Sequence, residues 1–137
     1  VQRGLVLHEM LALCAQNLLS QGEATSARQV ILQAAETLRQ NYQQELSLAG
    51  LMADAHMSKS YFLRLFRRYM GTTPYNYLVN FRITQAKELL VLTDHTVSEI
   101  AREVGFGDAS NFSTRFSRAT GQSPLQYRKN ALKSAEK

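Results

Sequence analysis

Apolar residues recur along the chain at the three- and four-residue spacing typical of amphipathic helices, and no segment alternates for long enough to form a strand. Polar turns interrupt the pattern, and most of them end in a serine or threonine suited to cap the next helix. The pattern predicts an all-α fold with helices over 2–20, 27–42, 48–55, 59–70, 74–92, 97–104 and 108–120, and a last helix opening at 123–124. The expected N-caps are Ser26, Ser47, Ser58, Thr73 and Thr96. Gly71 and Gly121 are placed to end two of these helices.

One helical unit occurs twice in the sequence. When residues 51–78 are aligned with residues 100–128, the second copy carries one extra residue in its turn. The residues that then match are Phe62 with Phe112, Phe66 with Phe116, Gly71 with Gly121, Pro74 with Pro124 and Tyr77 with Tyr127. Because internal similarity at this period marks a repeated structural unit, we expect two similar helical subdomains joined by the long helix 74–92.

Each unit has the pattern of a helix-turn-helix. In the helix 59–70, Phe62, Leu65 and Phe66 fall on one side, whereas Ser60 and Arg64 fall on the other. A short helix and a tight turn precede it. In such a motif the second helix lies in the DNA major groove, and residues near its start reach the base edges.

The distribution of charge favours a nucleic-acid partner. The net charge of +5 and the pI near 9.6 suit an anionic partner, with nucleic acid ahead of a membrane surface. No acidic residue stands between Asp54 and Glu88 or between Asp108 and Glu136, although basic residues are frequent in both intervals. An ordinary helical hairpin with a solvated face would mix the two signs at short range. Their segregation in both copies predicts a surface that faces phosphates.

A longer motif resembles that of a known family. Ala101-x3-Gly105-Phe106-x5-Phe112-x3-Phe116-x4-Gly121-x-Ser123-Pro124-x2-Tyr127-Arg128 is similar to the signature of AraC/XylS-type bacterial transcription regulators, and Arg82-x3-Ala86-x2-Leu89-Leu90 fits it too. The resemblance covers about residues 28–130. It implies seven helices, two helix-turn-helix units held by the long connecting helix, and recognition helices 59–70 and 109–120 in successive major grooves. It also implies an upstream effector-sensing domain and contact with RNA polymerase.

The resemblance assigns candidate DNA contacts by position. The implied base-contacting residues are Ser60, Leu63, Arg64, Ala109, Ser110, Ser113 and Thr114. The expected phosphate-contacting residues are Ser58, Lys59, Arg67, Arg68, Thr72, Thr73, Ser117, Arg118, Gln122 and Ser123. Arg64 suits a bidentate guanine contact, while Leu63 either touches a thymine methyl or packs against the core. Asp108 caps its helix with a carboxylate that would compete with phosphate for the same N–H groups.

The second unit departs from the family pattern. Thr114 and Ser117 stand where basic residues are frequent, so we expect the first unit to read more of the DNA sequence. Arg115 aligns with the apolar Leu65 and must therefore reach solvent or find a partner. Arg82 either bridges helices or touches phosphate, and the same two roles remain open for Arg128.

The expected domain organisation has four parts. Residues 1–21 form an apolar helix that contacts a missing upstream sensor or dimerisation domain or a second copy of itself, with an interfacial membrane helix as a weaker alternative. A stop at residues 20–22 leads to a linker over 22–27. The first helix-turn-helix and the connecting helix occupy 28–92, and the second unit occupies 93–137. The chain opens inside a helical pattern without an initiator methionine, so we expect that an upstream part is missing.

Other chemistry finds little support in the sequence. The three histidines, His8, His56 and His95, are far apart with no ligand spacing, and Cys14 is the single cysteine, so we expect no metal, no cofactor and a reducing compartment. Gly105-Phe106-Gly107 follows no strand and is a turn rather than a dinucleotide loop. No nucleophile–base pair indicates an enzyme. No spanning segment or signal peptide is visible, and a cytoplasmic, nucleoid-associated protein is expected.

The sequence therefore predicts a sequence-specific double-stranded DNA-binding domain of a transcription regulator. An architectural or RNA-binding module is one alternative, and it would lose affinity uniformly whichever base is changed. A protein-interaction module acting through residues 2–20 is another, and its binding to DNA would be weak and independent of salt.

Overall fold

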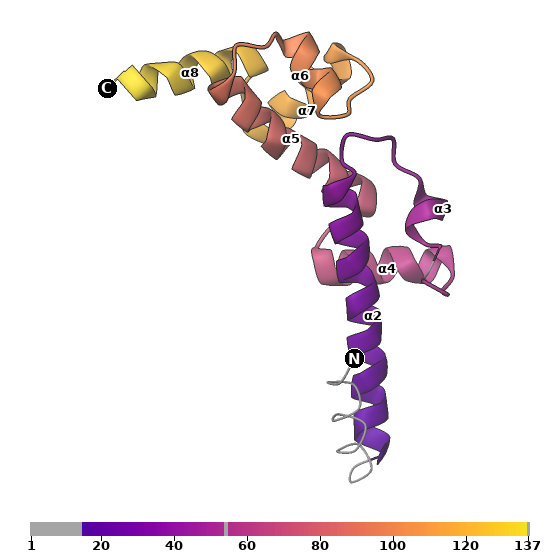
Figure 1. Ribbon diagram of the computed structural model, residues 1–137. Coiled ribbons are helices and arrows are strands. Elements are labelled where there is room, and N and C mark those ends of the chain that lie inside the picture. The colour runs from indigo at the N-terminus through magenta and orange to yellow at the C-terminus, as the bar shows by residue number, and fades with distance from the viewer. Residues whose placement is uncertain (1–14, 54, 137) are drawn as a thin grey trace.

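The computed structural model describes residues 15–53 and 55–136 and shows only helices there, which confirms the all-α prediction (Figure 1). The helices are α2 (Ala15–Gln40), α3 (Leu48–Leu51), α4 (Lys59–Met70), α5 (Pro74–Leu92), α6 (Val97–Glu103), α7 (Ala109–Thr120) and α8 (Pro124–Glu136). α5 runs from a lower group formed with α2, α3 and α4 to an upper group formed with α6, α7 and α8 (Figure 1). The arrangement is that of two helical units on one connecting helix.

Most of the predicted helix boundaries are confirmed through their caps. The side chains of Ser47, Ser58, Thr73 and Thr96 each accept a hydrogen bond from the backbone N–H three residues later, at distances of 3.1 to 3.2 Å. α4 and α7 both end at a glycine in the left-handed region, with φ of 81° at Gly71 and 82° at Gly121. α6 ends at Glu103, one residue before its predicted end.

The prediction that a linker over 22–27 separates two helices is wrong. α2 is continuous from Ala15 to Gln40, so neither the stop at residues 20–22 nor the N-cap at Ser26 is present. A glycine inside a helix costs only about 1 kcal/mol relative to alanine, and the neighbouring Glu, Ala, Arg and Gln residues favour a helix. Without a proline, one glycine is insufficient to end it. Most of the predicted helix 2–20 lies outside the described residues.

α3 is shorter than the predicted helix 48–55. It ends at Leu51, and Met52 forms its C-cap. His56 then adopts the left-handed region with φ of 53°, an unfavourable conformation for a residue other than glycine. The chain therefore uses the second half of the predicted helix to turn toward the N-cap of α4 at Ser58.

Each unit has its own hydrophobic core, and α5 contributes to both. The first core consists of Ile31, Ala34, Ala35, Leu38, Phe62, Leu65, Phe66 and Leu78. The second consists of Val79, Ile83, Ala86, Leu90, Ile100, Ala101, Val104, Phe106, Phe112 and Phe116. Leu78 and Val79 are adjacent on α5 but belong to different cores, and Tyr42 packs against both. The two cores thus adjoin at the start of α5.

The aromatic side chains repeat the duplication in three dimensions. In the first unit the centre of the Phe66 ring lies 6.1 Å from the ring centre of Phe62 and 5.8 Å from that of Tyr77, and the contact with Tyr77 is edge-on. In the second unit the Phe116 ring lies 5.6 Å from Phe112 and 5.4 Å from Tyr127, again edge-on. Aligned residues therefore pack in the same way, as expected for two copies of one structural unit.

Arg82 and Arg128 bridge helices, which decides one of the questions that the sequence left open. Arg82 is 7% exposed and donates to the carbonyl oxygens of Tyr42 at 2.7 Å and Gln44 at 2.6 Å, just after α2. Arg128 donates to the carbonyl oxygens of Leu90 and Thr93, at the end of α5. Burial lowers the pKa of the Arg82 guanidinium from its ordinary value. Arg128 thereby satisfies a carbonyl that the end of α5 leaves unpaired, and Arg82 satisfies two carbonyls of the segment that follows α2.

Candidate nucleic-acid interface

α4 presents a polar and basic face to solvent. Its apolar side is fixed in the first core by Phe62, Leu65 and Phe66, so the opposite side must face outward. The exposed residues on or next to that side are Ser58, Lys59, Ser60, Arg64, Arg67 and Arg68. The helix contains no acidic residue, and the guanidinium of Arg64 lies 5.7 Å from the ring centre of Tyr61. This contact supports the long Arg64 side chain at the surface.

Leu63 is half-buried and packs against the first core. The structure thus shows the packing role considered for this residue, and the part that remains accessible lies beside Arg64 on α4. A thymine-methyl contact by Leu63 remains a prediction.

α7 presents a different surface, which is polar but carries less charge. Ser110 and Thr114 are exposed, while Ala109, Ser113 and Ser117 are half-buried. The N-cap carboxylate of Asp108 accepts a hydrogen bond from the Asn111 N–H at 2.6 Å, whereas α4 has the neutral Ser58 in this position. A carboxylate at the N-terminus opposes binding of a second anion there. The two candidate recognition helices therefore differ in electrostatics although they share a backbone design.

The turns before α5 and α8 hold the remaining predicted phosphate contacts, which are half-buried Thr72, Thr73 and Gln122 and exposed Ser123. Thr73 and Ser123 already cap α5 and α8 through their hydroxyl oxygens. The side-chain oxygen of Gln122 accepts a hydrogen bond from Asn130 at 2.6 Å, which orients the Gln122 carboxamide. Each cap can still donate its hydroxyl hydrogen to a phosphate oxygen.

Arg115 makes a cation–π contact with a residue of α5. Its guanidinium lies 5.5 Å from the ring centre of Tyr75, and the side chain is half-buried. The first unit has the buried Leu65 at the matching position. The duplication therefore replaces a core residue by a cation at the contact between α5 and α7.

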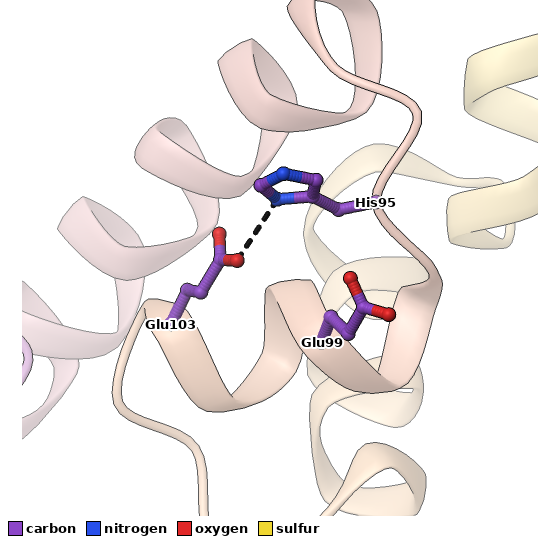
Figure 2. A group of neighbouring side chains, drawn as sticks. All are labelled: His95, Glu99 and Glu103. Carbon is purple, nitrogen blue, oxygen red and sulfur yellow. Dashed lines mark ion pairs between the residues drawn. The ribbon is translucent and has the colours of Figure 1, made fainter.

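Sequence reasoning missed a cluster of potential metal ligands next to α6. His95 Nδ1 lies 2.8 Å from Glu103 Oε1, and these atoms and a carboxylate oxygen of Glu99 lie within 4.8 Å of one another (Figure 2). The spacing Glu99-x3-Glu103 places both carboxylates on one side of α6, and His95 stands just before the N-cap Thr96, so this pattern could have indicated the cluster. Among the described residues, these could hold a metal ion. The side chains of His95 and Glu103 are 41% and 38% exposed, however, and His95 Nδ1, although buried itself, makes no hydrogen bond to Glu103.

In the part of the chain that the structure describes, no helix has the length and apolar character needed to cross a membrane.

Comparison with known proteins identifies the family. The family described as "Helix-turn-helix domain" matches residues 51–130, which is more than half of the chain and includes both units. The chain belongs to the AraC/XylS family of transcription regulators. It has the fold of an AraC-type DNA-binding domain, as predicted, and its relatives are named as regulators rather than enzymes.

Similar proteins come from several bacteria. The chain is 36% identical over 90 residues to the probable transcriptional regulator LumQ of Photobacterium leiognathi, covering 66% of this chain and 36% of LumQ. It is 31% identical over 126 residues to the HTH-type transcriptional activator RhaS of Salmonella schwarzengrund, covering 92% of this chain and 45% of RhaS. The chain thus spans less than half the length of these curated relatives.

Two solved structures share both the fold and substantial sequence. The C-terminal domain of AraT, a response regulator from Geobacillus stearothermophilus, is 30% identical with a TM-score of 0.69, covering 74% of this chain and 84% of that one. The DNA-binding domain of AdpA, a global transcriptional factor, was solved in complex with a target DNA. It is 30% identical with a TM-score of 0.68, covering 73% of this chain and 90% of that one.

Proposed function

We propose that the chain binds double-stranded DNA sequence-specifically to regulate transcription, with α4 and α7 in successive major grooves. The observation that carries the proposal is the exposed polar face of each of these helices on a duplicated unit. α5 holds the two units with 19 residues, about 28 Å at ~1.5 Å per residue, and successive major grooves lie ~34 Å apart. The DNA complex of the similar AdpA domain supports this use of the fold.

The predicted contact residues divide into readers of bases and holders of phosphates. We propose base contacts by Ser60, Leu63, Arg64, Ala109, Ser110, Ser113 and Thr114. Phosphate contacts are proposed for Ser58, Lys59, Arg67, Arg68, Thr72, Thr73, Ser117, Arg118, Gln122 and Ser123. Arg64 is exposed and supported by Tyr61, which suits a bidentate contact with guanine. The first unit is proposed to read more of the sequence, because α7 offers short neutral side chains on a helix capped by Asp108.

Selection of bound DNA fragments by the purified chain tests the function as a whole. A motif with two half-sites about one helical turn apart is expected, and log affinity should fall by about 0.9 per phosphate contact against log salt. An affinity that is the same whichever base is changed, with no enriched motif, would instead support a non-specific nucleic-acid-binding module. Weak binding that is insensitive to salt would leave protein interaction as the better function.

Arg64→Ala is expected to reduce discrimination between the selected site and scrambled DNA by about 1–3 kcal/mol, or 5- to 150-fold, through loss of one bidentate base contact. Thr114→Ala should have a smaller effect, because a hydroxyl has only one hydrogen to donate and cannot make the two parallel N–H bonds of a guanidinium. Arg28→Ala, on an exposed site of α2, is the control for loss of one positive charge. Affinities for the selected and the scrambled DNA, measured by fluorescence anisotropy, show which variant loses more discrimination. An equal loss of discrimination in Thr114→Ala and Arg64→Ala would refute dominance of the first unit.

The remaining roles concern a longer protein. Because the relatives are more than twice as long as the matched segment, we propose that an upstream effector-sensing domain completes the regulator. Activation through RNA polymerase is supported by the relatives named as activators, such as RhaS. A cytoplasmic, nucleoid-associated location and a homodimer through residues 2–20 complete the proposal, although 2–14 lie outside the described residues.

A further inference from the structure

A small hollow lies between α5 and α7, at the joint between the two units. Its volume is about 230 Å³, room for several water molecules at about 30 Å³ each. It is lined by Asn76, Val79, Asn80, Arg115, Arg118 and Ala119. The arginines are three residues apart on α7, and the asparagines are four residues apart on α5. Each pair therefore lies on one side of its helix, so that two cations and two carboxamides border the same space.

The charges of this hollow are not balanced by protein groups. None of the lining residues is acidic, and neither Arg115 nor Arg118 takes part in an ion pair among the described residues. The Arg115 guanidinium is held by the Tyr75 ring instead of by a carboxylate. Two neighbouring cations repel each other, so an anion bound between them would relieve the repulsion.

The duplication shows that the fold does not require a cation at this position. The matching residue of the first unit, Leu65, is 6% exposed and belongs to the core formed by α2 and α4. A leucine would also suit the half-apolar contact between α7 and α5, which includes Val79 and Ala119. The presence of Arg115 is therefore explained better by a ligand than by packing.

We propose that this hollow binds one phosphate group of the DNA backbone, between the base pairs read by α4 and those read by α7. The inference rests on the proposed function and adds Arg115, Asn76 and Asn80 to the interface. Arg118 connects the hollow to the proposed base-contacting surface, because it lies one helical turn after Thr114 on α7. A duplex that receives both recognition helices must pass its backbone between them. Guanidinium and carboxamide N–H groups are suitable donors to phosphate oxygens.

Arg115→Leu tests the site because it installs the residue that the first unit already has. The variant is expected to fold and to melt at or above the temperature of the unaltered chain. Its affinity should fall about eightfold at 0.1 M salt on selected and scrambled DNA alike, and the slope of log affinity against log salt should decrease by about 0.9. Arg28→Leu is the matched control and should leave both values unchanged.

Duplexes with a single uncharged methylphosphonate locate the contact. One substitution between the half-sites should weaken binding of the unaltered chain and have no further effect on Arg115→Leu. A melting series with inorganic phosphate against chloride at equal ionic strength tests free anions as the ligand. Stabilisation by free phosphate that Arg115→Leu abolishes, without any sensitive methylphosphonate position, would overturn the assignment to DNA.

The inference and the proposed function fail in distinguishable ways. If the unaltered chain binds DNA and Arg115→Leu binds it with the same affinity and salt slope, the phosphate site is refuted and the proposed function stands. If the unaltered chain binds no DNA, the proposed function fails and the inference fails with it, whatever the free-phosphate series shows of the hollow.

Discussion

Phe116→Ala is expected to destabilise the second unit by about 3–5 kcal/mol, the usual cost of removing a fully buried phenylalanine. Phe116 is 0% exposed and packs between the rings of Phe112 and Tyr127, which come from α7 and α8. Its removal would leave a cavity where these two helices meet. Since this cost is comparable to the whole stability of many small domains, the second unit should be largely unfolded at moderate temperature.

The separate cores make the effect local. Phe116 belongs to the second core and the aligned Phe66 to the first, so Phe66→Ala is the corresponding control in the first unit. Hydrogen exchange followed by mass spectrometry should show lost protection in α6 and α7 for Phe116→Ala but retained protection in α4. The reverse is expected for Phe66→Ala. Equal loss of protection in both units would show that α5 couples them into a single cooperative unit, contrary to this prediction.

The duplication made much of the fold predictable from sequence. Phenylalanines at helical spacing, capping serines and threonines, and the terminal Gly71 and Gly121 are local signals, and they located α4, α5 and α7 closely. The errors arose where a local signal was weak. Gly22 suggested a break, but one glycine costs less than the continuous α2 gains from its other residues. The turn after α3 depends on the left-handed backbone of His56, a conformation that remains uncommon even for histidine, in which it is enriched.

The sequence predicted which side of the recognition helix α4 is exposed, but it did not predict the contacts of the arginines that lie between helices. Helical periodicity was sufficient to place Ser60 and Arg64 on the exposed side of α4, because the opposite side is apolar. The roles of Arg82, Arg115 and Arg128 depend on partners that are 35 to 40 residues away in the sequence. Arg82 bonds to Tyr42, and Arg115 contacts Tyr75 on a different helix. Such contacts exist only once the two units are packed, so a pattern along the chain cannot show them.

The joint between the units should be sensitive to a single methyl group at Gly105. Its φ is +101°, and a Cβ there would lie 2.7 Å from the carbonyl oxygen of Tyr42 and 2.9 Å from Nε of Arg82. Those are the two atoms of the 2.7 Å hydrogen bond through which α5 holds the segment that follows α2. Gly105→Ala would therefore strain the backbone and separate Arg82 from its acceptor at the same time.

We expect Gly105→Ala to lower the free energy of unfolding by about 2–6 kcal/mol, from about 1–3 for the strained backbone and about 1–3 for the carbonyl left unpaired. Gly107→Ala is a matched control in the same turn, because it has no neighbouring atom within 4 Å and no positive φ. Its effect should stay within about 0.5 kcal/mol. Urea denaturation followed by circular dichroism measures both. Similar midpoints for the two variants would show that the Arg82 bridge adapts and that this joint is not what fixes one unit against the other.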